Sequence, residues 1–326
     1  MKRIIALMLA AVMALGIFAG CAQEPVQTPA DDTQPAVPMN VVALSGPTGI
    51  GMAKLAADGK ENGKYNVTFA SAPDEITGLI VNGEVDVACV PTNLAAALYA
   101  KTNGSISVTA VTTMGVLYLL DKTGGIESIA DLEGKTVGAT GQGSNPEYIL
   151  NYILAENGLT VGENVNVNFY GEHAELASLM ISGEVDIAML PVPFATQVEG
   201  KIEGINVLNL QDEWNKVCDT ALAQGVVIVR NEYLENNKEQ FDAFLDDLKA
   251  STEYAVNDVE GAAQLCGDLG IIAQEVALKA IPYCNLTFSE GAEMKATVSA
   301  FLQVLFDANP KATGGSLPGD EFYYAR

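Results

Sequence analysis

Few side chains in this sequence could carry out acid–base, nucleophilic or metal chemistry. Among 326 residues there is one histidine, His173, and the five cysteines form no Cys-x-x-Cys pair. Zinc and similar metal sites need several imidazole or thiolate ligands, and a catalytic triad needs an imidazole beside its nucleophile. The sequence therefore argues against a metal cofactor and against triad-type catalysis.

Two acidic pairs have a spacing that could suggest a general acid and a general base: Glu84 with Asp86, and Glu184 with Asp186. Each pair comes at the start of a predicted strand. In an open parallel sheet ligands bind beyond the carboxyl ends of the strands, and a catalytic pair must converge on one substrate. We therefore expect all four carboxylates to have structural roles away from the binding site.

The segment SGPTGIGMA, residues 45–53, has the glycine spacing of the P-loop pattern GxxxxGK[ST]. Met52 stands where the pattern has lysine, and Ala53 where it has the hydroxyl that binds Mg²⁺, so the sequence argues against nucleotide hydrolysis. The backbone N–H groups of such a loop could still donate to an oxygen-rich ligand. The alternative is a tight turn that needs glycine for its backbone angles.

The charge of the chain argues against nucleic acid as a partner. Lys2 and Arg3 precede Cys21, and after them 15 basic residues stand against 41 acidic ones, a net charge of −26. A protein that binds nucleic acid needs a basic surface to neutralise phosphates. Apolar residues make up 49% of the chain, which is enough for a core in one large or two medium domains.

An internal repeat organises the middle of the chain. Residues 79–95 (LIVNGEVDVACVPTNLA) return as residues 179–195 (LMISGEVDIAMLPVPFA), with no gap and with eight of seventeen positions identical. In each copy a helix ends at glycine, an apolar strand follows, and proline ends the strand. A period of 100 residues has the size of a domain, whereas solenoid repeats are ~20–50 residues long. The repeat predicts two similar lobes.

Strands and helices alternate around each copy, which predicts an α/β fold with parallel sheets and right-handed crossovers. Asn145 is placed to cap a helix, with Pro146 at the first helical position. We expect the chain to cross between the lobes over residues 116–124 and 221–230, so that lobe 1 comprises residues 39–120 with 225–326 and lobe 2 comprises residues 121–224. The predicted strands cover residues 41–44, 65–70, 85–90, 136–139, 165–170, 185–190 and 226–229, and the predicted helices cover residues 50–57, 75–81, 146–156, 174–181, 239–256, 259–269, 274–280 and 291–306.

The first 38 residues predict export and a lipid anchor. Lys2 and Arg3 precede a sixteen-residue apolar run, which is short of the ~20 residues of a membrane-spanning helix and typical of a signal peptide over residues 1–20. The segment FAGC, which ends at Cys21, resembles a bacterial lipobox, in which the cysteine becomes the lipidated first residue. Residues 22–38 hold four prolines, three acids and no aromatic residue, which predicts an unfolded tether. An ordinary signal peptide and a short membrane helix remain the alternatives.

The sequence resembles the ABC-transporter substrate-binding lipoproteins of the nitrate, sulfonate, taurine and thiamin-precursor type. The lipobox, the tether, the two GEVD repeats, the segment DLEGKTVG at residues 131–138 and the tail GGSLPGDEFYY at residues 314–324 carry the resemblance. It implies a periplasmic-binding-protein-like fold of type II, in which two α/β lobes close on a small molecule and a membrane permease with its ATPase reads the closed form. It further implies a lipid-anchored position on the extracytoplasmic face of the cell membrane, no cofactor and no catalysed reaction, and it leaves the ligand open.

The loops that follow the strands of both lobes should face the ligand. Arginine occurs only at residues 3, 230 and 326, so these loops lack a guanidinium clamp for a carboxylate. This favours a small polar or heterocyclic ligand, such as a thiamin-like or pyrimidine compound, over a simple amino acid. The candidate ligand-binding residues offer hydroxyl, amide, backbone and aromatic groups: Ser45, Thr48, Gly49, Thr92 and Asn93 on lobe 1, and Thr140, Gln142, Gly143, Ser144 and Phe194 on lobe 2.

Several assignments stay open at this point. His173 could contact the ligand or lie at the surface, and Trp214 could stack on the ligand or lie in the core. Cys266 and Cys284 could form a disulfide in an exported protein. Two other functions also remain. One is a lipoprotein that presents a small molecule to a sensor or a secondary transporter. The other is a biosynthetic enzyme on the same fold, although the enzymes of menaquinone and thiamin-pyrimidine synthesis that resemble it are cytosolic.

Overall fold

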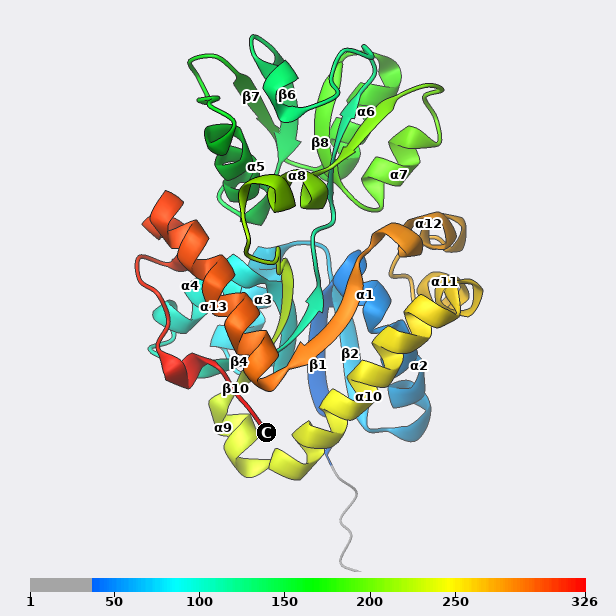
Figure 1. Ribbon diagram of the computed structural model, residues 1–326. Coiled ribbons are helices and arrows are strands. Elements are labelled where there is room, and N and C mark those ends of the chain that lie inside the picture. Colours follow the sequence, from blue (N-terminus) through cyan, green and yellow to red (C-terminus); the bar gives the residue numbers. More distant parts are fainter. Residues whose placement is uncertain (1–36) are drawn as a thin grey trace, which may run out of the picture. The chain divides into compact units, whose positions relative to one another are not determined.

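Two β-sheets organise residues 37–326, the part of the chain that the computed structural model describes (Figure 1). The expected signal peptide, the lipidation site at Cys21 and the tether up to residue 36 lie outside the described residues. Each sheet has helices packed against it, and we call the two assemblies the six-stranded half and the five-stranded half. This mixed α/β architecture confirms the predicted fold class.

The six-stranded sheet has the strand order β11-β4-β10-β3-β1-β2. Strand β1 pairs in parallel with β2 and β3, whereas β10 runs antiparallel between β3 and β4. Strands β1, β2 and β3 therefore end at one edge of the sheet, where the loops that follow them come together. The strands are β1 (Met39–Leu44), β2 (Tyr65–Ala70), β3 (Val87–Pro91), β4 (Ile106–Thr113), β10 (Gly225–Arg230) and β11 (Leu286–Glu290).

The five-stranded sheet repeats this arrangement in the order β7-β6-β8-β5-β9. Strand β6 pairs in parallel with β7 and β8, and β5 runs antiparallel beside β8 as β10 does beside β3. The repeat of 100 residues is kept, because β3 ends at Pro91 and β8 at Pro191. The strands are β5 (Leu117–Asp121), β6 (Thr136–Thr140), β7 (Asn166–Tyr170), β8 (Ile187–Pro191) and β9 (Asn206–Asn209).

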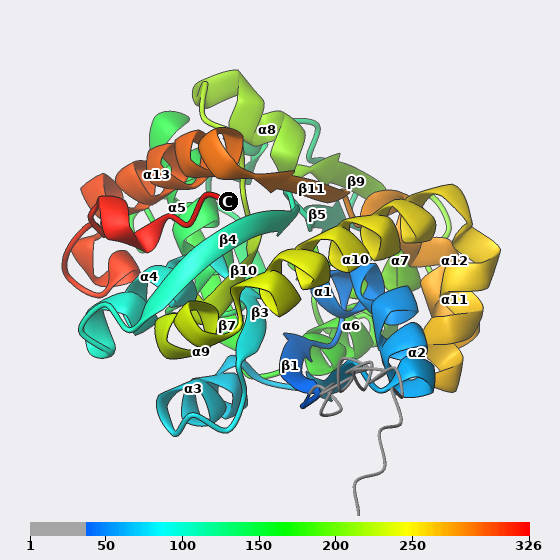
Figure 2. The same ribbon diagram turned by 90° about the horizontal axis from the view of Figure 1, so that it is seen from below.

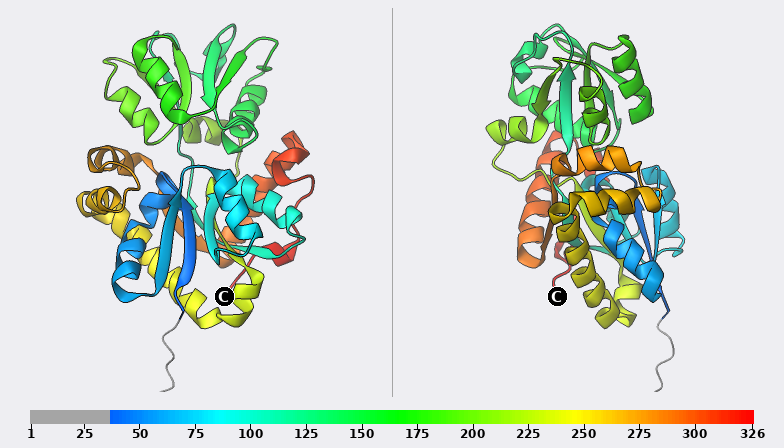
Figure 3. Two further views of the ribbon diagram at one scale, coloured as in Figure 1. Left: turned by 180° about the vertical axis from the view of Figure 1, so that it is seen from behind. Right: turned by 90° about the vertical axis from the view of Figure 1, so that its right-hand side faces the viewer.

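The chain passes twice between the two halves (Figure 3). The first passage, residues 114–116, connects β4 to β5, and the second, residues 218–224, connects a helix of the five-stranded half to β10. The expected boundary at residue 120 falls inside β5, which belongs to the five-stranded sheet. Both passages thus come slightly earlier than the crossings expected at residues 116–124 and 221–230.

Helices follow the strands in both halves, and α10 and α13 pack on the six-stranded half near β11 and β4 (Figure 2). The six-stranded half contains α1 (Pro47–Gly51), α2 (Ala53–Asn62), α3 (Pro73–Val81), α4 (Thr92–Lys101), α9 (Asn231–Asn236), α10 (Lys238–Asn257), α11 (Val259–Asp268), α12 (Gln274–Ala280) and α13 (Gly291–Ala308). The five-stranded half contains α5 (Asn145–Glu156), α6 (His173–Ser182), α7 (Phe194–Glu199) and α8 (Leu210–Val217). None of the helices within residues 37–326 is long and apolar enough to cross a membrane.

The helix predicted over residues 50–57 is divided into α1 and α2 at Met52. A side chain from α10 causes the division. The Ser251 hydroxyl accepts a hydrogen bond from Leu55 N at 3.0 Å and donates to Gly51 O at 2.8 Å, so it replaces the helical bonds at this point. The first helix after β1 is therefore only five residues long.

Two of the four acidic residues of the repeat, Asp86 and Asp186, stabilise the starts of β3 and β8, as expected. Asp86 is buried, accepts a hydrogen bond from Asn40 N and pairs with Arg230 Nη2 at 3.1 Å. Its counterpart Asp186 is exposed and pairs with Lys122 Nζ at 2.9 Å. Both ion pairs lie at the opposite end of the strands from the candidate ligand loops, and the carboxylates of Asp86 and Asp186 already have cationic partners.

An aromatic cluster joins the two halves. Trp214 on α8 is fully buried, and its ring lies 4.8 Å from the ring of Tyr152 on α5 and 5.7 Å from that of Phe301 on α13. Its indole N–H donates to Thr220 O at 2.5 Å. Trp214 is thus a core residue and not a surface for ligand stacking. Cys266 and Cys284 are both buried and free, so the structure contains no disulfide between them.

Candidate ligand-binding site

The loop after β1 is built for close packing of α1. Gly46 precedes α1 with φ of 114°, a backbone angle that favours glycine. Thr48 Oγ1 donates to Leu44 O at 2.9 Å, and a Cβ on Gly49 would lie 2.8 Å from that same carbonyl oxygen. Backbone conformation at Gly46 and close packing at Gly49 therefore explain these two glycines. Ser45 is exposed and makes no side-chain hydrogen bond in the described part of the chain.

The residues after β3 face the second passage between the halves. Thr92 is fully buried, its hydroxyl donates to Ala223 O at 2.6 Å, and its N–H donates to Gln224 O at 3.2 Å. Asn93, the second residue of α4, is only 6% exposed. Its Oδ1 is buried and has no hydrogen-bond partner among residues 37–326. Thr92 thus positions the loop, and Asn93 keeps unused hydrogen-bonding capacity.

Three of the strand-end residues in the five-stranded half lie together. Thr140 Oγ1, at the end of β6, lies 2.5 Å from His173 Nδ1, and the imidazole ring lies 5.4 Å from the ring of Phe194. Burial lowers the pKa of His173, and the Glu172 carboxylate raises it to a smaller extent. The net effect favours the neutral imidazole. His173 thus belongs to the same strand-end cluster as Thr140 and Phe194.

The start of α5 differs from the expected capping pattern. Ser144 is the N-cap, without a capping side-chain bond, and Asn145 is the first helical residue, so the prediction of Asn145 as N-cap was wrong by one position. The Asn145 side chain instead donates from Nδ2 to Gln224 O at 3.2 Å, and its Oδ1 is buried without a partner in the described residues. Gln142 and Gly143 are exposed, and Gly143 N donates to Glu147 Oε2 at 2.5 Å.

The second passage brings residues of both halves together. Gln224 O accepts from Asn145 of the five-stranded half and from Thr92 N of the six-stranded half. The next residue, Gly225, has no room for a side chain, because a Cβ would lie 2.9 Å from Thr113 Cβ and 3.0 Å from Thr48 Cγ2. Four residues therefore converge on residues 224 and 225: Thr48, Thr92, Thr113 and Asn145.

The sequence reasoning missed three of these residues: Thr113, Gln224 and Gly225. Gln224 also accepts a hydrogen bond from Val116 N through Oε1 at 2.6 Å, so it ties the two passages together. No motif marks these residues, because Thr113 ends β4 whereas Gln224 and Gly225 lie more than 100 residues later, at the start of β10. The available signal is that residue 224 lies inside the predicted crossing of residues 221–230 and just before the predicted strand of residues 226–229, where buried polar side chains must find partners.

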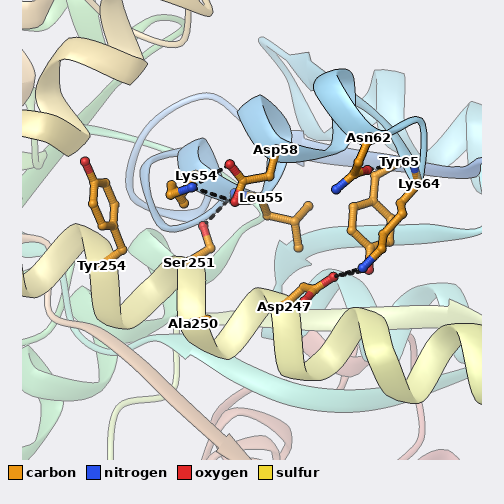
Figure 4. A pocket seen from close by; sticks show the side chains of 10 residues that line it. All are labelled: Lys54, Leu55, Asp58, Asn62, Lys64, Tyr65, Asp247, Ala250, Ser251 and Tyr254. Carbon is orange, nitrogen blue, oxygen red and sulfur yellow. Dashed lines mark hydrogen bonds and ion pairs between the residues drawn. The ribbon is translucent and has the colours of Figure 1, made fainter.

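Two pockets of the described residues lie away from these loops. One, of about 280 Å³, lies between α2 and α10 (Figure 4). Its charged groups already pair with one another: Lys54 with Asp58, and Lys64 with Asp247, which also accepts from the Tyr65 hydroxyl at 2.7 Å.

A second pocket, of about 420 Å³, lies beside the first passage and is lined by Met114, Gln211, Asn215, Ala221, Asn285, Leu286 and Thr287. Neither pocket contains a predicted site residue. Within residues 37–326 no group of three or more His, Cys, Asp or Glu side chains is arranged to hold a metal ion.

Comparison with known proteins identifies the fold. A family model described as NMT1/THI5 like matches residues 65–262. A solved structure described as an ABC transporter, from Parabacteroides distasonis, is 27% identical with a TM-score of 0.75, over 89% of this chain and 99% of its own. The periplasmic aliphatic sulphonate binding protein SsuA from Escherichia coli is 16% identical with a TM-score of 0.69, over 89% of this chain and 92% of its own.

The periplasmic nitrate-binding protein NrtA from Synechocystis PCC 6803 is 12% identical, with a TM-score of 0.57, over 85% of this chain and 84% of its own. A search of functionally curated proteins finds no match. These likenesses confirm the predicted periplasmic-binding-protein-like fold. The neighbours named here are described as binding or transport proteins and not as enzymes.

Proposed function

Because this chain belongs to the NMT1/THI5-like family, we propose that it is the extracytoplasmic solute-binding component of an ABC importer. It binds a small molecule between the strand-end loops of the two halves and delivers it to a membrane permease that is driven by a cytoplasmic ATPase. The observation that carries this proposal is the convergence of Thr92 and Asn145, from opposite halves, on the carbonyl oxygen of Gln224. Ligands of open α/β sheets bind at such strand ends.

The two halves act as lobes in this proposal. Lobe 1 carries the six-stranded sheet and lobe 2 the five-stranded sheet, and residues 114–116 and 218–224 form the hinge. A ligand that prefers the closed arrangement shifts the population toward it. Small-angle scattering of the protein with and without a saturating compound tests this motion, and equal radii of gyration would contradict it.

The candidate site combines residues from the strand-end loops of both lobes. Asn93 and Thr48 contribute from lobe 1, and Thr140, Ser144 and Phe194 contribute from lobe 2. Mass spectrometry of the compounds retained by gently purified protein identifies the ligand. Its affinity is then measured for the variants Thr48→Ala, Asn93→Ala and Ser144→Ala. Unchanged affinity in all three variants would refute this site.

The transport role has a direct test in cells. Deletion of the gene should abolish uptake of the retained compound, and a Cys21→Ser variant should restore binding activity but release the protein into the medium. The second result follows because two acyl chains on Cys21 suffice for stable membrane attachment. Normal uptake in the deletion strain would instead favour presentation to a sensor, and chemical turnover of the compound by purified protein would favour an enzyme.

A further inference from the structure

Three residues that contact residues 224 and 225, or that adjoin one that does, carry a buried polar atom without a hydrogen-bond partner among residues 37–326: Asn93 Oδ1, Thr113 Oγ1 and Asn145 Oδ1. The residues that carry them are 6%, 2% and 2% exposed. Most buried polar groups in proteins are paired, because an unpaired one loses its hydration without compensation. We call these three residues the orphan cluster. Two further unpaired atoms, Thr112 Oγ1 and Glu290 Oε2, are not part of it.

Members of the orphan cluster come from both halves and surround the same short segment. Asn145 Nδ2 and the N–H of Thr92, which precedes Asn93, both lie 3.2 Å from Gln224 O. Thr113 O accepts from Gln224 N at 3.0 Å, and Thr113 Cβ lies 2.9 Å from the position of a Cβ on Gly225. The cluster therefore lies where the proposed lobes meet, at the ends of β3 and β4 and the start of α5.

The free capacity of this cluster is for accepting hydrogen bonds. Asn145 already uses Nδ2 as a donor to Gln224 O, so its Oδ1 can only accept. Asn93 Oδ1 can likewise only accept, whereas the Thr113 hydroxyl can accept or donate. A ligand group that satisfies the two amide oxygens must therefore supply N–H or O–H donors.

The charges around the cluster disfavour an ionic ligand group. Arg230 pairs with Asp86 at the far end of β3, and the Glu147 carboxylate already binds Gly143 N at the start of α5. An oxyanion would meet carbonyl oxygens without a cation. A buried cation would have no carboxylate among the cluster residues, which are all uncharged, and an unpaired buried charge is costly. An uncharged donor avoids both penalties.

We propose that the orphan cluster is the deep end of the ligand site and binds uncharged N–H groups of the ligand, as found in amides, ureas and amino-substituted heterocycles. This inference rests on the proposed function. The three polar atoms are covered in this structure, so the ligand reaches them when the two lobes separate. The nitrate and sulphonate ions named for the structural neighbours lack such donors, and this protein therefore differs from those neighbours in ligand class.

The first test needs no ligand. Thr113→Val removes an unpaired hydroxyl without changing side-chain shape, and should raise the melting temperature of the ligand-free protein. Thr92→Val is the matched control, because the Thr92 hydroxyl is also buried but donates to Ala223 O at 2.6 Å, and this variant should melt lower. A lower melting temperature for Thr113→Val would show that the hydroxyl is satisfied, by water for example, and would overturn the proposal.

The second test identifies the ligand class. Protein stripped of bound compounds is equilibrated with urea, nicotinamide and cytosine as uncharged N–H donors, with nitrate and methanesulfonate as oxyanions, and with a small-molecule extract of the host cells. Retained compounds are identified by mass spectrometry. The retained compound should be an uncharged N–H donor. Retention of an oxyanion would overturn the inference but leave the proposed function intact, whereas retention of nothing would refute the proposed function.

Variants then connect the compound to the cluster. Asn145→Leu and Thr113→Val should each weaken its binding roughly tenfold, as expected for loss of one buried hydrogen bond. Thr109→Val, in the same strand as Thr113, is the control, because its hydroxyl faces Val227 O at 3.4 Å, and it should leave the dissociation constant unchanged. If Asn145→Leu does not fold, Thr113→Val alone decides. Unchanged binding in that variant would refute the assigned subsite.

Discussion

Replacing Gly115 by alanine should destabilise the protein at the first passage between the halves. A Cβ at this position would lie 2.5 Å from Gln211 Oε1, 3.0 Å from Gln211 Cβ and 2.9 Å from Cδ2 of the fully buried Leu222. Overpacking of this kind costs about 1–3 kcal/mol. The Gln211 side chain must also move, which breaks its hydrogen bond from Gly115 N, now 3.0 Å long, at a further cost of about 1 kcal/mol. We expect the free energy of unfolding to fall by about 2–4 kcal/mol in total.

A double-mutant cycle isolates the contact with Gln211. Gln211→Ala removes one of the two residues that a Cβ on Gly115 would meet, and alone should cost about 1 kcal/mol for the lost hydrogen bond. The double variant should therefore be more stable than the sum of the two single costs predicts, by about 1–2 kcal/mol. Urea unfolding followed by circular dichroism measures all four proteins. Gly78→Ala, in the exposed part of α3 with nothing near its Cβ position, is the control and should stabilise by about 0.5–1 kcal/mol. Strictly additive costs, or a neutral Gly115→Ala, would refute the packing argument.

Two further predictions concern charge. Arg230→Met leaves the buried Asp86 without its cation and should lower the free energy of unfolding by about 3 kcal/mol. Lys122→Met removes the cation of the corresponding residue Asp186 and should lower it by at most about 1 kcal/mol, because Asp186 is exposed. Equal losses for the two variants in urea unfolding would contradict this reasoning. The pKa of His173 is lowered by burial, so the unfolded chain binds more protons below its ordinary pKa of about 6.5. The free energy of unfolding should therefore decrease as the pH falls through about 6.5 and level off below the folded-state pKa, relative to a His173→Gln variant measured in parallel. If the wild type instead became more stable than the His173→Gln variant as the pH falls, measured as the free energy of unfolding, this prediction would be wrong.

The repeated elements of the fold could be predicted from the sequence because their signals are local. Apolar runs between glycine and proline place β3 and β8 within two residues of their observed starts and within one of their ends. The sequence predicts a crossing where β5 lies, because this short antiparallel strand beside β8 has no turn motif that marks it. The break between α1 and α2 could not be predicted either, because Ser251, which causes it, lies 196 residues from Leu55 in the sequence.

The candidate site was predicted less completely than the fold. The rule that ligands bind at strand ends selects segments that lie near the second passage, such as Thr92 with Asn93 and the loop before α5. It could not select Thr113 or Gln224, because their proximity depends on the register of β10 between β3 and β4. It also could not show that the Thr92 hydroxyl donates to Ala223 O while Asn93 Oδ1 has no partner among residues 37–326. Sequence pattern indicates which loops meet, but hydrogen-bond partners follow only from the three-dimensional pairing.

The aromatic cluster that joins the halves gives the protein a built-in optical reporter. Trp214 is the only tryptophan in the chain, so the indole fluorescence comes from one site without any label. Its ring is fully buried and lies 5.7 Å from Phe301, which belongs to the other half. A rearrangement that parts α8 from α13 would let water reach the indole and move its emission to longer wavelength. A rotation about the two passages that keeps this contact would leave the emission unchanged, so a titration monitored by this single fluorophore distinguishes the two kinds of domain motion.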